Sequence, residues 1–128
     1  LEKTIKKFNN QIKIFNGKYV LKNKNDFNSN FKYLAFCGIG TPENFFNLLK
    51  QNNIKIKKRL IYPDHYNYNK SDVDKIIKIA SDNNLKIITS EKDYMKIKKF
   101  KNLKVKYTDV DLNINNISFF KKFLINNF

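Results

Sequence analysis

From Phe31 onward the chain alternates short apolar runs with segments of helical periodicity. Apolar runs bounded by polar turns predict buried strands, and apolar positions spaced three and four apart predict helices that cover a sheet. Strands are predicted at residues 31–37, 54–62, 85–89 and 103–107. Because strands that alternate with helices are typical of right-handed βαβ units, we expect an α/β fold with a mainly parallel sheet of about four strands flanked by helices.

Start signals mark the predicted helices. Thr41 is a candidate cap for a helix over residues 42–51, with Pro42 at its first position. Two stretches match the capping-box pattern, at residues 71–74 and 90–93, and predict a second helix and a short third one. A closing helix is predicted over residues 117–127. The residues expected to face the core from these helices are Phe45, Leu48, Leu49, Val73, Ile76, Ile77, Ala80, Phe120 and Leu124.

The first thirty residues have a different pattern. Residues 11–15 and 19–21 alternate apolar and polar positions around Asn16-Gly17, which predicts a β-hairpin. Residues 22–30 are polar and rich in asparagine, as expected of a loop or linker. We therefore divide the chain into a hairpin and linker over residues 1–30 and an α/β domain over residues 31–128.

Length and composition indicate a globular domain. A chain of 128 residues can bury roughly two-thirds of the surface that it exposes when unfolded. Its 41% hydrophobic content excludes the disordered class, and no apolar run approaches the ~18 residues of a membrane-spanning helix. The single cysteine, Cys37, lies in an apolar stretch and is expected to pack as a small hydrophobe. The chain begins at Leu1 without a signal-peptide pattern, so we expect a fragment of a cytosol-facing protein.

The net charge changes the set of expected partners. Lysine and arginine total 26 against 11 acids, which gives a net charge of +15. A positive field of this size attracts phosphates, nucleic acid or an anionic membrane. Nearly all the cations are lysines scattered among asparagines and isoleucines, a pattern that is also typical of the residue bias of an AT-rich genome. The charge by itself therefore leaves both explanations open.

Three polar clusters follow predicted strands, at residues 38–41, 63–66 and 89–93. Loops at the carboxyl ends of parallel strands converge, so these clusters are the candidate site. The first resembles a phosphate loop, but Glu43 stands where a dinucleotide fingerprint requires glycine, and no Gly-Lys-Ser/Thr follows. The negative charge of Glu43 in the first helical turn also compensates the positive end of the helix dipole, which leaves less attraction for a phosphate. We interpret Gly38 and Gly40 as a tight turn with close backbone approach.

The second cluster holds the only histidine, His65. Its unperturbed pKa of about 6.5 suits proton transfer near neutral pH. Neighbouring Asp64 could orient the imidazole or cap the following turn, and a lone histidine is more often structural than catalytic. In the third cluster, Lys92 is either a cation available to a phosphate or a solvated lysine of a first helical turn.

Together the three clusters resemble a known family. Ala35-Phe36-Cys37-Gly38-Ile39-Gly40-Thr41-Pro42-Glu43-Asn44-Phe45-Phe46, then Tyr62-Pro63-Asp64-His65-Tyr66, then Thr89-Ser90-Glu91-Lys92-Asp93 look like the C-terminal part of tetraacyldisaccharide 4'-kinase, the lipid A kinase. The resemblance covers residues 31–98 well and the ends by pattern only. Thr41 stands where the family more often has Asn, and Ser90 where it usually has Thr. Both departures preserve capping chemistry.

The resemblance implies an enzyme that moves the γ-phosphate of ATP, with Mg²⁺, to the 4'-hydroxyl of the lipid A disaccharide precursor at the cytoplasmic face of the inner membrane. The Walker loop and magnesium-binding acids of the family lie in an N-terminal P-loop domain, so ATP and Mg²⁺ are expected to be bound mainly there. His65 matches the family histidine that helps to activate the acceptor hydroxyl. The expected catalytic residues are His65 and Asp64, and the residues expected near substrate or phosphate are Lys92, Ser90, Gly38 and Gly40.

Two further interpretations belong to other classes. A basic module that binds nucleic acid or an anionic membrane without catalysis fits the charge, but the chain lacks the aromatic-glycine pattern of an RNA-recognition sheet and a helix-turn-helix turn. The second alternative is a structural remnant of a kinase that has lost its nucleotide-binding half. We expect the chain alone to be inactive. We expect it to associate peripherally with the anionic surface of the inner membrane and not to bind nucleic acid.

Overall fold

The computed structural model describes residues 17–114. The chain divides into two compact units, one formed by residues 21–111 and the other by the two ends of the chain. The predicted strand over residues 11–15 and the predicted closing helix over residues 117–127, with Phe120 and Leu124, lie outside the described residues. All three candidate clusters lie in the larger unit.

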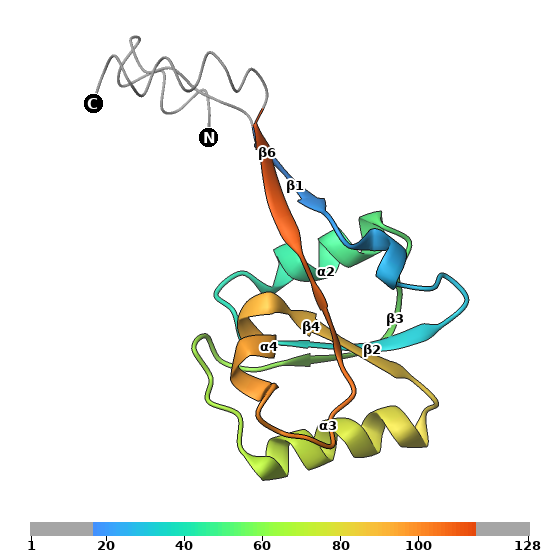
Figure 1. The fold of residues 1–128 in the computed structure, drawn as a ribbon, viewed down its shortest axis with the longest axis vertical. Coiled ribbons are helices and arrows are strands. Elements are labelled where there is room, and N and C mark those ends of the chain that lie inside the picture. The colour runs from blue at the N-terminus through green and yellow to red at the C-terminus, as the bar shows by residue number, and fades with distance from the viewer. Residues whose placement is uncertain (1–16, 115–128) are drawn as a thin grey trace. The chain divides into compact units, whose positions relative to one another are not determined.

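A four-stranded parallel sheet forms the centre of the larger unit (Figure 1), as predicted. Its order is β3-β2-β4-β5. The strands are β2 (Lys32–Cys37), β3 (Lys55–Ile61), β4 (Lys86–Ser90) and β5 (Lys106–Thr108). β5 begins later than the predicted residue 103, because Leu103 and Val105 pack against the apolar core without joining the ladder.

Helices cover both faces of this sheet. They are α2 (Pro42–Gln51), α3 (Lys70–Asp82) and α4 (Glu91–Ile97), with a short 3-10 turn, η1 (Lys24–Asp26). Successive side chains of β2 point to opposite faces, so one core contains Tyr33, Ala35 and Cys37 with the apolar side of α2. The other contains Leu34 and Phe36 with α3 and α4. Of the predicted core positions on α2 and α3, Phe45, Leu48, Leu49, Val73, Ile76 and Ala80 are buried.

The start of α3 corrects one sequence prediction. The capping box is formed by Asn69 and Asp72 rather than by Ser71 and Asp74. The Asn69 side chain accepts a hydrogen bond from the Asp72 N–H at 2.9 Å, and Asp72 accepts one from the Asn69 N–H at 3.0 Å. Asparagine is as good an N-cap as serine, so the same spacing two residues earlier gives an equivalent box and a longer helix.

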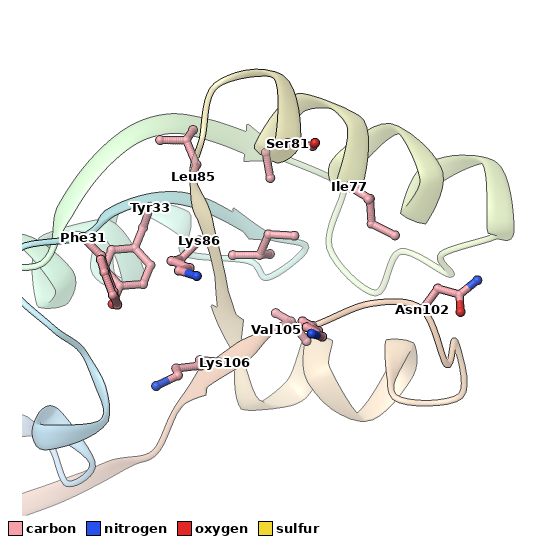
Figure 2. A pocket seen from close by; sticks show the side chains of 12 residues that line it. Phe31, Tyr33, Ile77, Ser81, Leu85, Lys86, Asn102, Val105 and Lys106 are labelled. Carbon is pink, nitrogen blue, oxygen red and sulfur yellow. The ribbon is translucent and has the colours of Figure 1, made fainter.

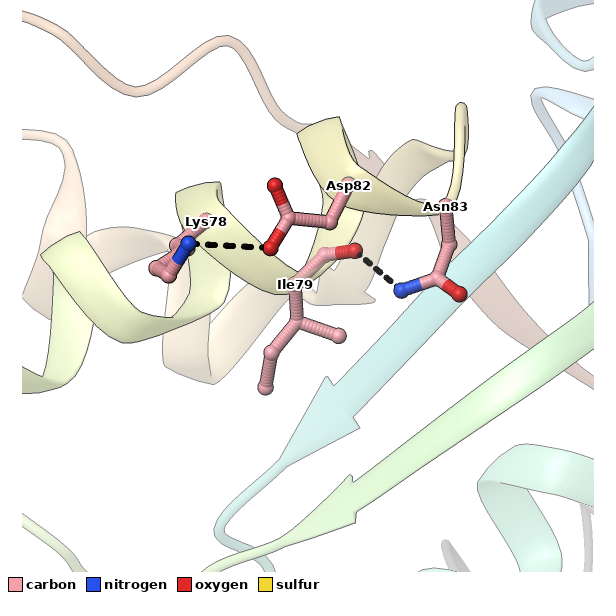
Figure 3. Close-up of polar contacts among 4 residues, drawn as sticks. All are labelled: Lys78, Ile79, Asp82 and Asn83. Carbon is pink, nitrogen blue, oxygen red and sulfur yellow. Dashed lines mark hydrogen bonds and ion pairs between the residues drawn. The ribbon is translucent and has the colours of Figure 1, made fainter.

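Side chains stabilise the C-terminal end of α3 (Figure 3). Asn83 donates from its amide to the carbonyl oxygen of Ile79 at 2.7 Å, which satisfies one of the unpaired carbonyls of the last turn. Lys78 and Asp82 form an exposed ion pair at 3.0 Å, one helical turn apart. Asn84 then takes a positive φ of 53° as the chain turns into β4.

The other unit contributes a two-stranded sheet to the described residues. It pairs β1 (Gly17–Leu21) with β6 (Val110–Ile114), two segments from opposite ends of the described chain. Gly17 was expected in a turn and instead is the first residue of β1. β6 was not predicted, although residues 110–114 alternate apolar and polar positions. None of the helices within residues 17–114 is long and apolar enough to span a membrane.

Candidate functional site at the carboxyl edge of the sheet

The strand order places a topological switch point between β2 and β4. The chain leaves β2 through α2 toward β3 on one side and leaves β4 through α4 toward β5 on the other side. Ligands of open α/β sheets bind outside the carboxyl ends of the strands at such a point. The loops after β2 and β3 and the N-terminus of α4, which directly follows β4, all lie at this edge, as expected from the sequence.

Asp93 joins these loops. Its side chain is 1% exposed, and both carboxylate oxygens lie 3.1 Å from the backbone nitrogen of Gly38. The hydroxyl groups of Tyr68 and Ser90 also donate to it, at 2.8 Å and 2.5 Å. We call Asp93, Gly38, Tyr68 and Ser90 the Asp93 junction. The sequence placed Asp93 in the third polar cluster and in a capping box but did not indicate these contacts, and it gave no signal for Tyr68.

Ser90 caps α4, as predicted, because its side-chain oxygen accepts the Asp93 N–H at 3.2 Å. Its hydroxyl proton is directed to the Asp93 carboxylate. Lys92 is exposed in the first turn of this seven-residue helix. The structure therefore gives Ser90 an internal structural contact and leaves Lys92 facing solvent.

The two glycines of the first cluster differ in their surroundings. A Cβ on Gly38 would lie 3.0 Å from the carbonyl oxygen of Pro63 and 3.2 Å from the Tyr68 hydroxyl. A Cβ on Gly40 would meet only Asp64, with its Oδ2 at 3.1 Å. The predicted close backbone approach is therefore found at Gly38. Its N–H donates to Asp93, so this glycine does not offer that N–H to a phosphate.

His65 lies in the loop between β3 and α3, and its side chain is 85% exposed. Its Nε2 lies 3.6 Å from Oδ2 of Asp64, which is itself half-exposed. The backbone of His65 has a positive φ of 60°, and its N–H donates to the Gly38 carbonyl oxygen at 3.2 Å. The other described non-glycine residues with positive φ are Asn53 and Asn84, and asparagine and histidine are both enriched in this conformation.

Aromatic side chains support the histidine loop. Tyr62, Tyr66 and Tyr68 contact one another, with ring centroids 4.9 to 5.2 Å apart. The Tyr66 hydroxyl donates to Asp72 at 2.9 Å, and Lys96 donates to the Tyr66 carbonyl oxygen at 3.1 Å. Because side chains on both sides of His65 are anchored, the exposed imidazole is carried by a loop with fixed ends.

The junction also perturbs nearby acid groups. Burial, followed by the negative charge of Asp93, raises the pKa of the Cys37 thiol to about 12. The same two causes raise the pKa of Tyr68. Both groups therefore stay protonated at neutral pH, and Tyr68 remains a hydrogen-bond donor to Asp93. Cys37 is buried, as predicted for a core thiol.

Within residues 17–114 no group of three or more His, Cys, Asp or Glu side chains could hold a metal ion. A groove of about 830 Å³ lies at the opposite, amino edge of the sheet, where Phe31, Lys86 and Lys106 line it (Figure 2). His65 and the Asp93 junction are not part of that groove.

The fold and the site define a doubly wound α/β domain with a histidine loop at its switch point. The family described as tetraacyldisaccharide-1-P 4'-kinase, LpxK, matches residues 2–128. The chain belongs to this family.

Relatives and a solved structure agree with this assignment. The chain is 40% identical to tetraacyldisaccharide 4'-kinase of Pelagibacter ubique (strain HTCC1062) over 114 residues, which are 89% of the chain and 36% of that relative. It is 38% identical to the enzyme of the same name from Rickettsia akari (strain Hartford), over 81% of the chain and 31% of the relative. The chain thus spans about a third of the length of these relatives.

The crystal structure of the "apo" form of LpxK from Aquifex aeolicus in complex with ATP has the same fold, with a TM-score of 0.56 at 20% identity. The match covers 94% of this chain and 40% of that one.

Proposed function

We propose that this chain is the C-terminal part of a tetraacyldisaccharide 4'-kinase, which transfers the γ-phosphate of ATP to the 4'-hydroxyl of the lipid A disaccharide precursor. One observation carries the proposal. In a chain of this family, the only histidine is exposed on an anchored loop at the edge of the sheet where ligands bind. A histidine with a purely structural role would be expected to pack in the interior or to pair closely.

His65 serves as the general base in the proposed reaction. Its unprotonated imidazole nitrogen accepts the proton of the acceptor hydroxyl while the oxygen forms its bond to the γ-phosphorus, and the bond from that phosphorus to ADP breaks. ADP leaves, and the imidazolium later releases the proton to solvent. Oδ2 of Asp64 lies 3.6 Å from Nε2 and is the proposed partner that orients the imidazole, an effect that water weakens because both side chains are exposed.

ATP is the proposed donor, and we propose that ATP and Mg²⁺ are bound mainly by residues outside those described. Two observations support this: Gly38 gives its N–H to Asp93, and within residues 17–114 no group of three or more His, Cys, Asp or Glu side chains could hold a metal ion. Lys92 is the proposed contact to substrate or phosphate, since it is an exposed cation beside the junction. Ser90 and Gly38 act there through the loop conformation, and Gly40 lies beside Asp64.

A segment exchange tests the proposed function. If this chain replaces the C-terminal third of the Pelagibacter ubique relative, we expect the hybrid to phosphorylate the disaccharide precursor with ATP. The 128-residue chain alone is expected to show no transfer, because the described residues offer no phosphate loop. Thin-layer separation of radiolabelled product measures both. A folded hybrid without transfer, or micromolar ATP binding by the chain alone in calorimetry, contradicts the proposal.

We further propose that the enzyme is peripheral and contacts the anionic cytoplasmic face of the inner membrane. The edge strand β3 supports this proposal. Lys55, Lys57 and Arg59 line a surface hollow of about 530 Å³ together with Lys32 and Lys50, and no acid is among its lining residues. Clustered cations near a surface of anionic lipid contribute about 1 kcal/mol each. A cluster of cations with no acid among the lining residues of the hollow is attracted to such an anionic surface.

Binding to vesicles that contain anionic lipid is expected to fall steeply as salt rises above ~0.15 M, where the Debye length is about 8 Å. A variant with Lys55→Gln, Lys57→Gln and Arg59→Gln should bind at least tenfold more weakly in a sedimentation assay. The matched control changes three exposed lysines elsewhere, Lys98→Gln, Lys99→Gln and Lys101→Gln. Equal losses in the two variants, salt-insensitive binding, or tighter binding to single-stranded RNA than to vesicles would contradict the assignment.

A further inference from the structure

Asp93 makes different hydrogen bonds from Asp72, the acid at the same position in the first turn of α3. In a capping box, the acid at the third helical position accepts the backbone N–H of the cap residue. Asp72 does this for Asn69 at the start of α3. At the start of α4, the Asp93 carboxylate instead accepts from Gly38 and Tyr68, which come from the loop after β2 and the loop after β3. Its hydrogen bonds therefore connect three separate segments.

Two routes lead from Asp93 to His65. The first runs through one residue, because Gly38 donates its N–H to Asp93 and accepts the His65 N–H at its carbonyl oxygen, 3.2 Å away. The second runs through Tyr68, three positions after His65, whose hydroxyl donates to Asp93 at 2.8 Å. The histidine loop is therefore tied to one buried carboxylate both at His65 itself and near its far end.

Two backbone hydrogen bonds hold the chain at His65. Its φ of 60° lies in the left-handed region, which histidine enters more often than most non-glycine residues, and it belongs to a turn that the Tyr66 N–H closes on the Pro63 carbonyl oxygen at 3.1 Å. The His65 side chain is exposed, so packing of the imidazole does not impose it. The hydrogen bond to Gly38 is the backbone contact that the structure gives to the His65 N–H.

We propose that Asp93 is a positioning residue for His65, one that fixes the backbone from which the imidazole extends, through the Gly38 backbone and the Tyr68 hydroxyl. Its effect on turnover rests on the proposed function of His65, whereas its effect on the loop does not. A carboxylate that accepts several hydrogen bonds in the interior holds its donors strongly, because charge-assisted bonds are about twice as strong as neutral ones. Asp93 thereby connects the loop that carries the exposed His65 side chain to the rigid sheet.

The first test measures motion of the His65 amide in the 128-residue chain by NMR relaxation. The order parameter of a rigid backbone amide is about 0.85, and that of a flexible one is below about 0.6. We expect a rigid value for His65 in the unchanged chain and a fall below about 0.6 in Asp93→Asn. Thr89→Val is the matched control, because it removes another buried hydrogen bond, to the Phe36 carbonyl oxygen, that does not touch the histidine loop.

This readout separates positioning from stability, because an order parameter describes the folded state and does not follow the unfolding equilibrium. Both variants should lower the urea midpoint, but only Asp93→Asn should loosen His65. Tyr68→Phe removes a single hydroxyl from the junction and answers the same question if Asp93→Asn fails to fold. An unchanged His65 order parameter in the folded variants, with a lowered urea midpoint, would overturn the proposal.

The second test is a double-mutant cycle on turnover in the full-length kinase. With His65 present, Asp93→Asn should lower turnover at least tenfold. In a His65→Ala background it should cause no further loss, because the histidine to be positioned is gone. Equal losses in both backgrounds would show that Asp93 acts on stability alone. If His65→Ala does not change turnover, the proposed function fails, and the relaxation measurement still decides whether Asp93 orders the loop.

Discussion

Replacing His65 by alanine in the proposed full-length kinase is expected to lower turnover by about 10²- to 10⁴-fold, the range that a positioned general base contributes. The ATP Michaelis constant should stay nearly constant, because the proposed nucleotide site lies mainly in residues outside those described. The fold should be preserved, since the side chain is 85% exposed and buries little surface. Steady-state rates and the melting temperature, measured on the same preparation, give both quantities.

Two variants of the same loop are the controls for this result. Asn67→Ala changes another exposed residue of the loop and should leave turnover unchanged. Asp64→Asn should reduce turnover less than His65→Ala, because its carboxylate is 3.6 Å from Nε2 and both side chains are exposed to solvent. A stable His65→Ala variant with full turnover would remove the catalytic assignment and leave only the membership in the family.

The parallel sheet could be predicted because its strands are short apolar runs separated by clear start signals. Pro42 after Thr41, and Ser90 three residues before Asp93, mark helix starts that the structure contains. These signals are local, so a single sequence is enough to read them. The carboxyl edge followed from topology, since parallel strands that alternate with helices bring their following loops to one edge.

The hydrogen bonds within the site could not be predicted, because they join residues that are distant in the sequence. Asp93 reads as a capping residue, yet its carboxylate reaches Gly38, 55 positions earlier, and Tyr68, 25 positions earlier. Nothing local distinguishes Asp93 from Asp72, which does form an ordinary capping box. The choice of Asn69 over Ser71 as the cap of α3 was ambiguous for a related reason: both residues have an acid three positions later.

The replacement Gly38→Ala is expected to disturb both folding and catalysis. The added Cβ would lie 3.0 Å from the Pro63 carbonyl oxygen and 3.3 Å from Oδ1 of Asp93. The Pro63 oxygen belongs to the backbone of the histidine loop, so it cannot move away without moving the loop. We expect a loss of about 1–3 kcal/mol in the free energy of unfolding, as found for overpacked sites. Urea denaturation of the 128-residue chain measures this loss.

Turnover of the full-length Gly38→Ala enzyme should fall by up to about 10²-fold, the loss that a misplacement of about 1 Å can cause. Gly40→Ala is the matched control two residues later. Its Cβ would meet only the end of the half-exposed Asp64 side chain, which can rotate away, so stability should change by less than about 0.5 kcal/mol and turnover little. Equal behaviour of the two alanine variants would show that close backbone approach at Gly38 does not position the loop. A selective loss in Gly38→Ala would link the backbone of one buried glycine to the placement of the imidazole.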